Sequence, residues 1–293
     1  MNEQLLPLKL PPGLFTNGTP YSAEGRWGAG NLVRFFEQTI RPIGGWVRLL
    51  AASGSSLAAL TGTVRSALSW RNNAGDPRIA FGSEQKLQVV VAGVLADITP
   101  SGFTTGVVSS GPTGTVGQYG NGAYGVVNYG YGAPIAGFKA ADTWQFDTFG
   151  EELVAVNTSE NKLRIWDGDP THIAATAANS PSCLAVFTTA ERFLVALGAD
   201  SDGRQVWWAD QETSTSWDVS VDGSLAGNFP LSTAGVLMAG RRIRGASLLF
   251  TDLDVWQMTY LGDTDFIYSF RQVGDHCGLI APNAVAVVDG RAM

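Results

Sequence analysis

The sequence is short of charged residues, cysteine and histidine. Only 15% of its 293 residues are charged, and it contains two cysteines and two histidines. Cys183 and Cys277 lie far apart and form no CxxC pair, so the sequence indicates neither a disulfide framework nor a zinc site, and we expect two free, buried thiols. No run of 18 apolar residues is present, so no membrane-spanning helix is predicted.

The same shortages limit the chemistry that the chain offers. His276 and Cys277 are neighbours in sequence, but a Cys-His dyad is assembled in space, and a metal site needs three or four ligands. Four Asp-x-Asp pairs fall at expected turns, where aspartate bonds its own backbone, and none continues into a calcium loop. A GxGxxG match occurs at 120–125. A dinucleotide-binding site requires a strand before this motif and a helix after it, and neither is expected here. We therefore predict no enzyme activity, no catalytic residue, no metal and no cofactor.

Glycine and aromatic residues are plentiful instead. The chain has 36 glycines, nine tryptophans and fourteen phenylalanines, and 45% of it is hydrophobic. Disorder needs low hydrophobicity, a coiled coil needs many Ala, Glu, Lys and Leu, and collagen needs glycine at every third position. The composition therefore excludes these classes and favours a β-rich fold with an aromatic core.

The few charges are spread unevenly along the chain. Residues 1–66 carry six basic and three acidic side chains, whereas residues 67–293 carry 13 basic and 23 acidic ones. The segment 1–66 is also punctuated by proline and glycine, so we interpret it as an N-terminal arm that docks on an acidic partner. The acidic body argues against tight binding of nucleic acid, which depends on neutralising phosphates.

From about residue 67 the sequence alternates like short strands separated by turns. Groups of four such strands recur, and the third strand of each later group carries a tryptophan: Trp166, Trp207 and Trp256. A four-stranded unit that repeats every 40–50 residues is typical of a β-propeller blade. We therefore predict an all-β, β-propeller-like fold with a first blade at 67–101 and further blades at 139–293, incomplete at the C-terminus. An antiparallel sandwich is the alternative.

A Gly/Tyr-rich insert, residues 102–138, separates the first blade from the others. No charged residue occurs between positions 98 and 138, and Tyr119, Tyr124 and Tyr129 are each followed by glycine. Tyrosine rings on a compliant backbone suit adaptable contact surfaces. We expect a projecting loop or hairpin that makes contacts between subunits or at its tip, with a flexible linker as the alternative.

Two further groups are candidate interaction residues. Trp27 and Trp46 are expected to anchor the arm to a surface. Arg241, Arg242 and Arg244 form the densest basic cluster of the sequence. This cluster is expected to contact a phosphate or an acidic partner, or else to form a solvated hairpin turn or a salt bridge between subunits.

Several motifs occur in an order that is similar to a known group of proteins. They include Leu10-Pro-Pro-Gly-Leu-Phe-Thr-Asn-Gly-Thr-Pro-Tyr21, Gly25-Arg-Trp27, Ile40-Arg-Pro-Ile-Gly-Gly-Trp46, the Gly-Tyr insert, Val206-Trp-Trp-Ala-Asp-Gln-Glu212 and Val273-Gly-Asp-His-Cys-Gly-Leu-Ile-Ala-Pro-Asn283. The similarity extends over nearly the whole chain. In this order they resemble tail proteins of short-tailed bacteriophages, the group that includes the nozzle and the tail-hub, or packaged-DNA-stabilising, proteins.

The resemblance implies a structural role in the virion. Such subunits form a homohexameric tube below the portal and adaptor rings, retain the packaged genome and later conduct it outward, and carry fibres or tailspikes on their flank. DNA would pass through this channel without sequence-specific binding, which an acidic body favours because like charges repel. The alternative from another class is a carbohydrate-binding or glycoside-cleaving propeller, which predicts exposed tryptophans and paired carboxylates in a central cleft.

Overall fold

The computed structural model describes residues 13–19, 21–22, 24–36, 39–43, 49–107, 141–263, 266–288 and 291–292. The chain groups into two compact units, residues 1–50 and 51–293. In the described residues the regular structure consists of β-strands and one 3-10 turn at Ala199–Ser201. None of these residues belongs to a helix long and apolar enough to cross a membrane.

The described part of the smaller unit contains one hairpin. Strand β1 (Val33–Phe36) pairs antiparallel with β2 (Thr39–Pro42). An isolated parallel bridge joins Leu14 to Trp27. Many apolar side chains of this unit are exposed, among them Leu14, Tyr21, Leu32, Phe36 and Ile43.

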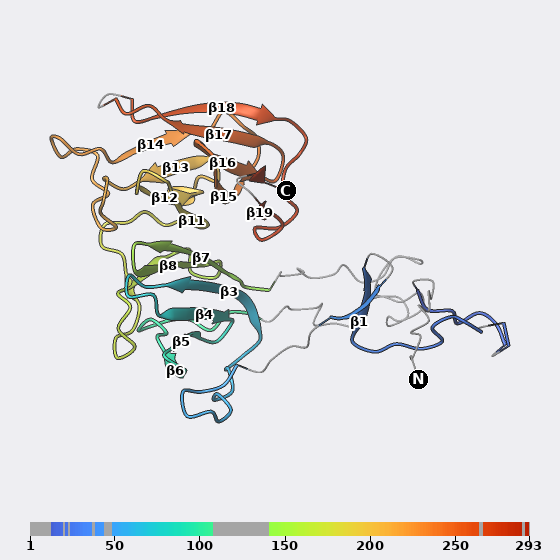
Figure 1. Ribbon diagram of the computed structural model, residues 1–293. Helices are drawn as coiled ribbons and strands as arrows, with labels where there is room; N and C mark the ends of the chain where they lie inside the picture. Colours follow the sequence, from blue (N-terminus) through green and yellow to red (C-terminus); the bar gives the residue numbers. More distant parts are fainter. Residues whose placement is uncertain are drawn as a thin grey trace, which may run out of the picture. The chain divides into compact units, whose positions relative to one another are not determined.

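The described residues of the larger unit form four four-stranded antiparallel sheets, each built from consecutive strands in chain order (Figure 1). The first sheet comprises β3 (Val64–Arg71), β4 (Pro77–Ser83), β5 (Leu87–Val91) and β6 (Val94–Asp97). The second comprises β7 (Trp144–Phe149), β8 (Glu152–Asn157), β9 (Leu163–Trp166) and β10 (Ala175–Thr176). The third comprises β11 (Ala185–Thr188), β12 (Leu194–Leu197), β13 (Gln205–Trp208) and β14 (Gly227–Pro230). The fourth comprises β15 (Leu237–Ile243), β16 (Ala246–Thr251), β17 (Val255–Tyr260) and β18 (Tyr268–Gly274).

The sheets pack face to face through their first strands, since β3 contacts β7, β7 contacts β11, and β11 contacts β15. A separate hydrophobic core fills each of the three spaces between successive sheets. Strand β8 shows how alternation supplies two of them: Leu153 and Ala155 belong to the core with the first sheet, whereas Val154 and Val156 belong to the core with the third. Each fully buried leucine or valine side chain contributes about 1.5–3 kcal/mol. This arrangement confirms the all-β, β-propeller-like fold.

Several details differ from the sequence-based expectations. Strand β3 begins at Val64, and residues 51–63 group with the larger unit rather than with an arm. The Cys277 thiol is exposed, so the expectation of two buried thiols is wrong for that residue. A short hairpin, β19 (Val287–Val288) with β20 (Arg291–Ala292), lies next to β15.

Candidate functional site

A cavity of about 570 Å³ lies where the first strands of the four sheets meet. We call it the central cavity. Strands β3, β7, β11 and β15 all contribute to its lining, and its polar residues include Arg65, Gln145, Asp147, Arg241 and Arg242. Aromatic side chains such as Phe146 and Phe187 form part of the remaining wall. The site therefore combines charged, amide and apolar surface.

Alternation along β7 determines which of its side chains can interact with the later sheets. Trp144 lies in the core with the first sheet, and Phe146 packs against that core. Because neighbouring residues of a strand point to opposite faces, Gln145 and Asp147 face the third sheet. The backbone N–H of Thr188 on β11 donates to Asp147 Oδ2 at 2.7 Å, which ties β7 to β11.

Asp147 is the carboxylate of the central cavity. Its Oδ1 accepts the backbone N–H of Thr148 at 2.8 Å and lies 3.8 Å from Arg242 Nη2, too far for a hydrogen bond. Burial raises the pKa of Asp147, although the Thr188 N–H bond and the Arg242 charge act in the opposite direction. The environment thus penalises the ionised carboxylate more than its partners compensate.

Arg241 is the least neutralised cation of the site. Its guanidinium donates from Nη1 to the carbonyl of Gly240 at 2.9 Å, and within the described residues no carboxylate oxygen lies within ion-pair distance of it. Burial lowers the pKa of Arg241, and the Asp147 charge raises it. A Cβ at Gly240 would collide with the ring of Phe187, so glycine is required where β15 crosses β11.

Gln145 carries a buried donor that has no partner. The side chain is 2% exposed, and its Nε2 makes no hydrogen bond to any described residue. A buried polar group without a partner costs about 1–3 kcal/mol. The residue lines the same central cavity as Arg241.

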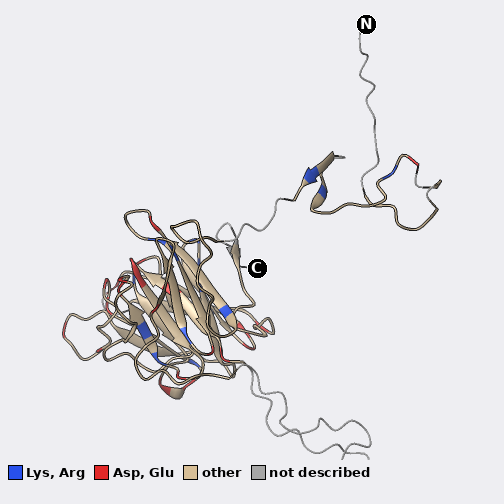
Figure 2. Cartoon of the chain, turned by 90° about the horizontal axis from the view of Figure 1, so that it is seen from below, with Lys and Arg blue, Asp and Glu red and all other residues tan. Residues whose placement is uncertain are grey.

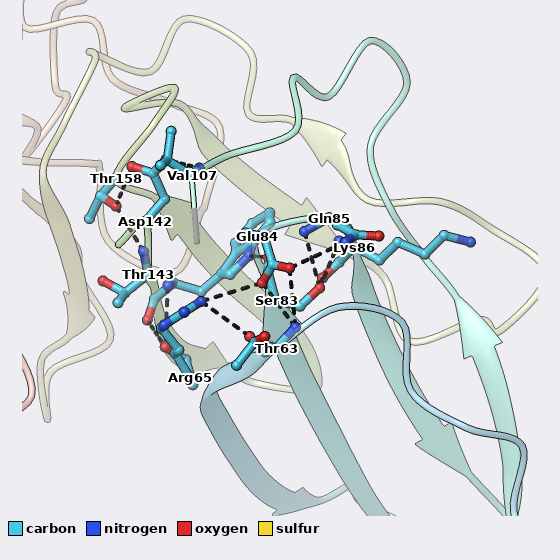
Figure 3. Close-up of polar contacts among 12 residues, drawn as sticks. Thr63, Arg65, Ser83, Glu84, Gln85, Lys86, Val107, Asp142, Thr143 and Thr158 are labelled. Atoms are coloured by element: carbon cyan, nitrogen blue, oxygen red, sulfur yellow. Dashed lines mark hydrogen bonds and ion pairs between the residues drawn. The ribbon is translucent and has the colours of Figure 1, made fainter. Parts of the chain in front are cut away.

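The base of the Gly/Tyr-rich insert forms a second polar cluster (Figure 3). The backbone N–H of Asp142 donates to the Val107 carbonyl at 3.0 Å, and the Val107 N–H donates to Asp142 Oδ2 at 2.7 Å. Gly106 N–H donates to the Glu84 carbonyl at 2.7 Å, which ties the start of the insert to the first sheet. The two ends of the insert therefore lie side by side at one point of the larger unit.

The Glu84 carboxylate holds this base to the segment before β3. It is 2% exposed and accepts the backbone N–H of Thr63 at 2.9 Å and Arg65 Nη1 at 3.3 Å. Burial acts to raise its pKa, but bonds from its own N–H and from Thr63, assisted by Gln85 and Arg65, hold the pKa of Glu84 below its usual value. The residues of this cluster bond to one another, so we interpret the cluster as structural. Arg65 also lines the central cavity.

The predicted interaction residues lie in different parts of the chain's structure. Arg241 and Arg242 lie in strand β15 and line the central cavity, so the expected solvated hairpin turn is wrong for these two residues. Arg244 lies in the turn after β15 and does not contribute to the lining. Trp27 is half-buried within the smaller unit. Trp46 and the three insert tyrosines, Tyr119, Tyr124 and Tyr129, lie outside the described residues.

The histidines and cysteines do not come together. His172 contacts Asp167 through Nδ1 at 2.6 Å in an exposed turn, and His276 contacts Asp275 at 2.9 Å. Burial raises the pKa of the Cys183 thiol to about 12, which makes it a poor nucleophile. Within the described ranges no three acidic, histidine or cysteine side chains are arranged to hold a metal ion.

Comparison with known proteins leaves the family open. No family model matches the sequence, and no curated protein matches it. The chain is similar to the extracellular domain of a hybrid two component system, BT4673, from B. thetaiotaomicron, with a TM-score of 0.34 and 10% identity over 76% of this chain and 29% of that chain. It is also similar to Hsv2p of Kluyveromyces lactis, with the same TM-score and identity over 76% of each chain. These likenesses are too weak to carry an argument, and the fold assignment rests on the strand order and packing given above.

Proposed function

We propose that the chain is a structural subunit of a phage tail nozzle or hub. In this role several copies, six by resemblance, form a ring-shaped channel below the portal and adaptor. The ring retains packaged DNA, conducts it during ejection without sequence-specific contacts, and carries fibres or tailspikes. The motif order described above supports this proposal, and so does a propeller-like unit that carries an arm and an insert.

The observation that carries the proposal is the closed base of the insert. Val107 and Asp142 bond reciprocally, so the insert joins the larger unit at one point instead of linking two separate bodies. The sequence between these residues contains Lys139 as its one charged side chain and is rich in glycine and tyrosine. Such a segment suits contact with another subunit, because tyrosine supplies large amphipathic surface at low entropic cost.

The exposed apolar residues of the smaller unit agree with the same role. Exposed apolar side chains in so small a unit suit a surface that a partner covers. Figure 2 shows that the strands of the larger unit are mostly uncharged and that acidic residues gather in its loops. A basic arm and an acidic body on the same chain favour contact between copies of that chain.

The lining of the central cavity favours this role over the glycosidase alternative. Glycoside hydrolysis generally needs two carboxyl groups about 5–9.5 Å apart on either side of the bond. Among the described residues that line the central cavity, Asp147 is the single carboxylate, and the other charged residues are Arg65, Arg241 and Arg242.

Deletion of the insert tests the proposal directly. We expect the full chain to sediment as a ring of several copies in analytical ultracentrifugation, and a variant with residues 108–140 replaced by a short Gly-Ser linker to lose ring formation while keeping its circular dichroism spectrum. The matched control replaces the exposed loop residues 219–224 by the same linker and keeps the ring. A full chain that stays monomeric and binds glycans on an array would overturn the proposal.

A further inference from the structure

The β1–β2 hairpin of the smaller unit has one exposed face. Arg34 pairs with Arg41 across the hairpin, and Phe36 pairs with Thr39. Because alternate residues of a strand point to opposite sides, these four side chains lie on the same side of the hairpin, and all four are exposed. The residues at the intervening positions are mostly half-buried. We call the exposed side the arginine face.

The arginine face carries two positive charges that no carboxylate neutralises. Arg34 and Arg41 stand directly opposite each other, and this arrangement is destabilising for like charges. Neither arginine forms an ion pair with any residue that the structure describes. Arg41 Cζ lies 4.8 Å from the centroid of the Phe36 ring, and Phe36 is 46% exposed. The face therefore lacks negative charge and offers an aromatic ring beside its cations.

The hairpin also lacks the neighbours that stabilise a small sheet. Within the described part of the chain no third strand pairs with β1 or β2. A two-stranded hairpin is only marginally stable in water by itself and gains stability from a further packed surface. Arginine and aromatic side chains are enriched at protein interfaces. The arginine face thus has the composition of a docking surface for an acidic partner.

The larger unit of a second copy offers the complementary charge. Residues 67–293 carry 23 acidic and 13 basic side chains, and acidic residues gather in the loops of the larger unit (Figure 2). The same excess of negative charge repels the phosphates of nucleic acid, whose binding depends on cations that neutralise several phosphates. Charge complementarity therefore favours a second copy over nucleic acid as the partner.

We propose that the arginine face docks on acidic loops in the larger unit of a second copy, with carboxylates placed at Arg34 and Arg41 and an apolar contact at Phe36. This inference rests on the association of copies proposed above and assigns the part that the arm has in it. Docking relieves the repulsion between the two arginines, which persists in the free chain.

Photocrosslinking of the full chain tests the proposal. The photoreactive residue p-benzoylphenylalanine replaces Phe36, and isotope-labelled copies are mixed with unlabelled copies before irradiation. Mass spectrometry then separates crosslinks between copies from crosslinks within one copy. We expect crosslinks between copies that run from this position to loops of the larger unit.

Substitution of the two arginines measures the dependence on charge. Arg34→Gln and Arg41→Gln should each lower the yield of crosslinks between copies about two- to fivefold, and the double variant about tenfold, as expected for exposed ion pairs. High salt should lower the yield in the wild-type background. Arg26→Gln is the matched control and should leave the yield unchanged, because Arg26 belongs to the same unit but lies outside the hairpin, over the Phe15 ring.

Hydrogen exchange in the free chain distinguishes docking from a structural role. Arg34→Gln removes the repulsion from Arg41 and keeps Arg41 against Phe36. Amide exchange of the hairpin in dilute protein should therefore be unchanged or slower in this variant. A merely structural role for Arg34 would make the exchange faster.

Three results would overturn the proposal. The first is crosslinking only within one copy, or only to the smaller unit of another copy. The second is a yield of crosslinks between copies that does not change in the double variant. The third is a random-sequence DNA duplex that is itself crosslinked, with the same dependence on both arginines, and suppresses the crosslinks between copies. Any of these results in a chain that sediments as a ring leaves the ring-forming role standing, whereas a chain that stays monomeric removes both proposals.

Discussion

Two buried carboxylates of the larger unit have opposite electrostatic environments. The pKa of Glu84 lies below its usual value, whereas the pKa of Asp147 lies above its usual value. Desolvation by the surrounding protein is the largest influence on the pKa at both sites. At Glu84 the backbone N–H bonds from Glu84 itself and from Thr63, assisted by Gln85 and Arg65, outweigh it. At Asp147 desolvation outweighs the bonds from Thr188 and Thr148 and the nearby arginine charges.

Their positions in the fold account for these donors. Glu84 follows β4 in a turn, where the free N–H groups of a neighbouring segment such as that at Thr63 can reach it. Asp147 stands in the middle of β7, where most backbone N–H groups belong to the ladder. Glu84, in a turn, therefore belongs to a cluster whose donors compensate for its burial. Asp147, on the first strand of its sheet, remains incompletely neutralised.

Trp144→Ala should have the largest effect, because Trp144 connects both sites. Its indole N–H donates to the Ser83 carbonyl at 2.8 Å, next to Glu84, and the residue also lines the central cavity. We expect a loss of about 3–5 kcal/mol in the free energy of unfolding, measured by urea denaturation. Trp207→Ala, at a half-buried tryptophan outside the cavity, is the control and should cost less. Equal costs would show that Trp144 does not hold the two sites together.

Glu84→Gln should cost about 1–3 kcal/mol at pH 7, because the donors from Thr63 and Arg65 lose a charged acceptor. Since the folded pKa is lowered, Glu84 stabilises the fold above its usual pKa of 4.5, and this stability is lost as the pH falls through the lower folded value. The difference between wild type and variant should therefore shrink between pH 7 and pH 3 in urea titrations. A difference that does not change with pH contradicts the assigned pKa shift.

Asp147→Asn should change the free energy of unfolding at pH 7 in the opposite direction to Glu84→Gln. It should stabilise the protein, by a smaller amount of about 1 kcal/mol. Because the folded pKa is raised, the favourable contribution is complete below the usual value of 3.8 and is lost as the pH rises through the folded pKa. Relative to wild type, the variant should therefore become more stable as the pH rises from 3 to 7. Thermal melts across this range measure the trend, and a trend like that of Glu84→Gln would remove the contrast between the two sites.

Arg242→Gln should have the smallest effect. Its side chain is 49% exposed and its pair with Asp147 is long, so the expected change is within about 0.5–1 kcal/mol. Urea denaturation at low and high salt checks this value. A loss of several kcal/mol would mean that Arg242 neutralises Asp147 more fully than its 3.8 Å separation indicates.

The sequence predicted most of the sheets because their strands alternate clearly. Apolar residues dominate Leu87–Val91 and Glu152–Asn157, which form β5 and β8 inside the predicted blade ranges. Strand β14 was missed because Gly227–Pro230 begins with glycine and ends with proline, both of which are depleted in strands. From the sequence alone, without knowledge of its partner strand, such a segment is predicted to be a loop.

The site was predicted only in part. Arg241 and Arg242 were recognised from their clustering, but the structure places both in strand β15 and not in the hairpin turn that was one of the expectations. Gln145 and Asp147 gave no signal, because polar residues at alternate positions of a strand normally indicate a solvent-facing side. Only the packing of the third sheet on β7 turns that side into the wall of a cavity.

Cryo-electron microscopy of the purified full-length chain is the most direct test of the central claim, that this propeller-like protein is a ring-forming tail subunit. We predict closed rings of several copies, each with four four-stranded sheets in its larger unit and with density from the insert at a contact between neighbours. Single particles that retain the four sheets but form no ring, at any protein concentration examined, would contradict the account.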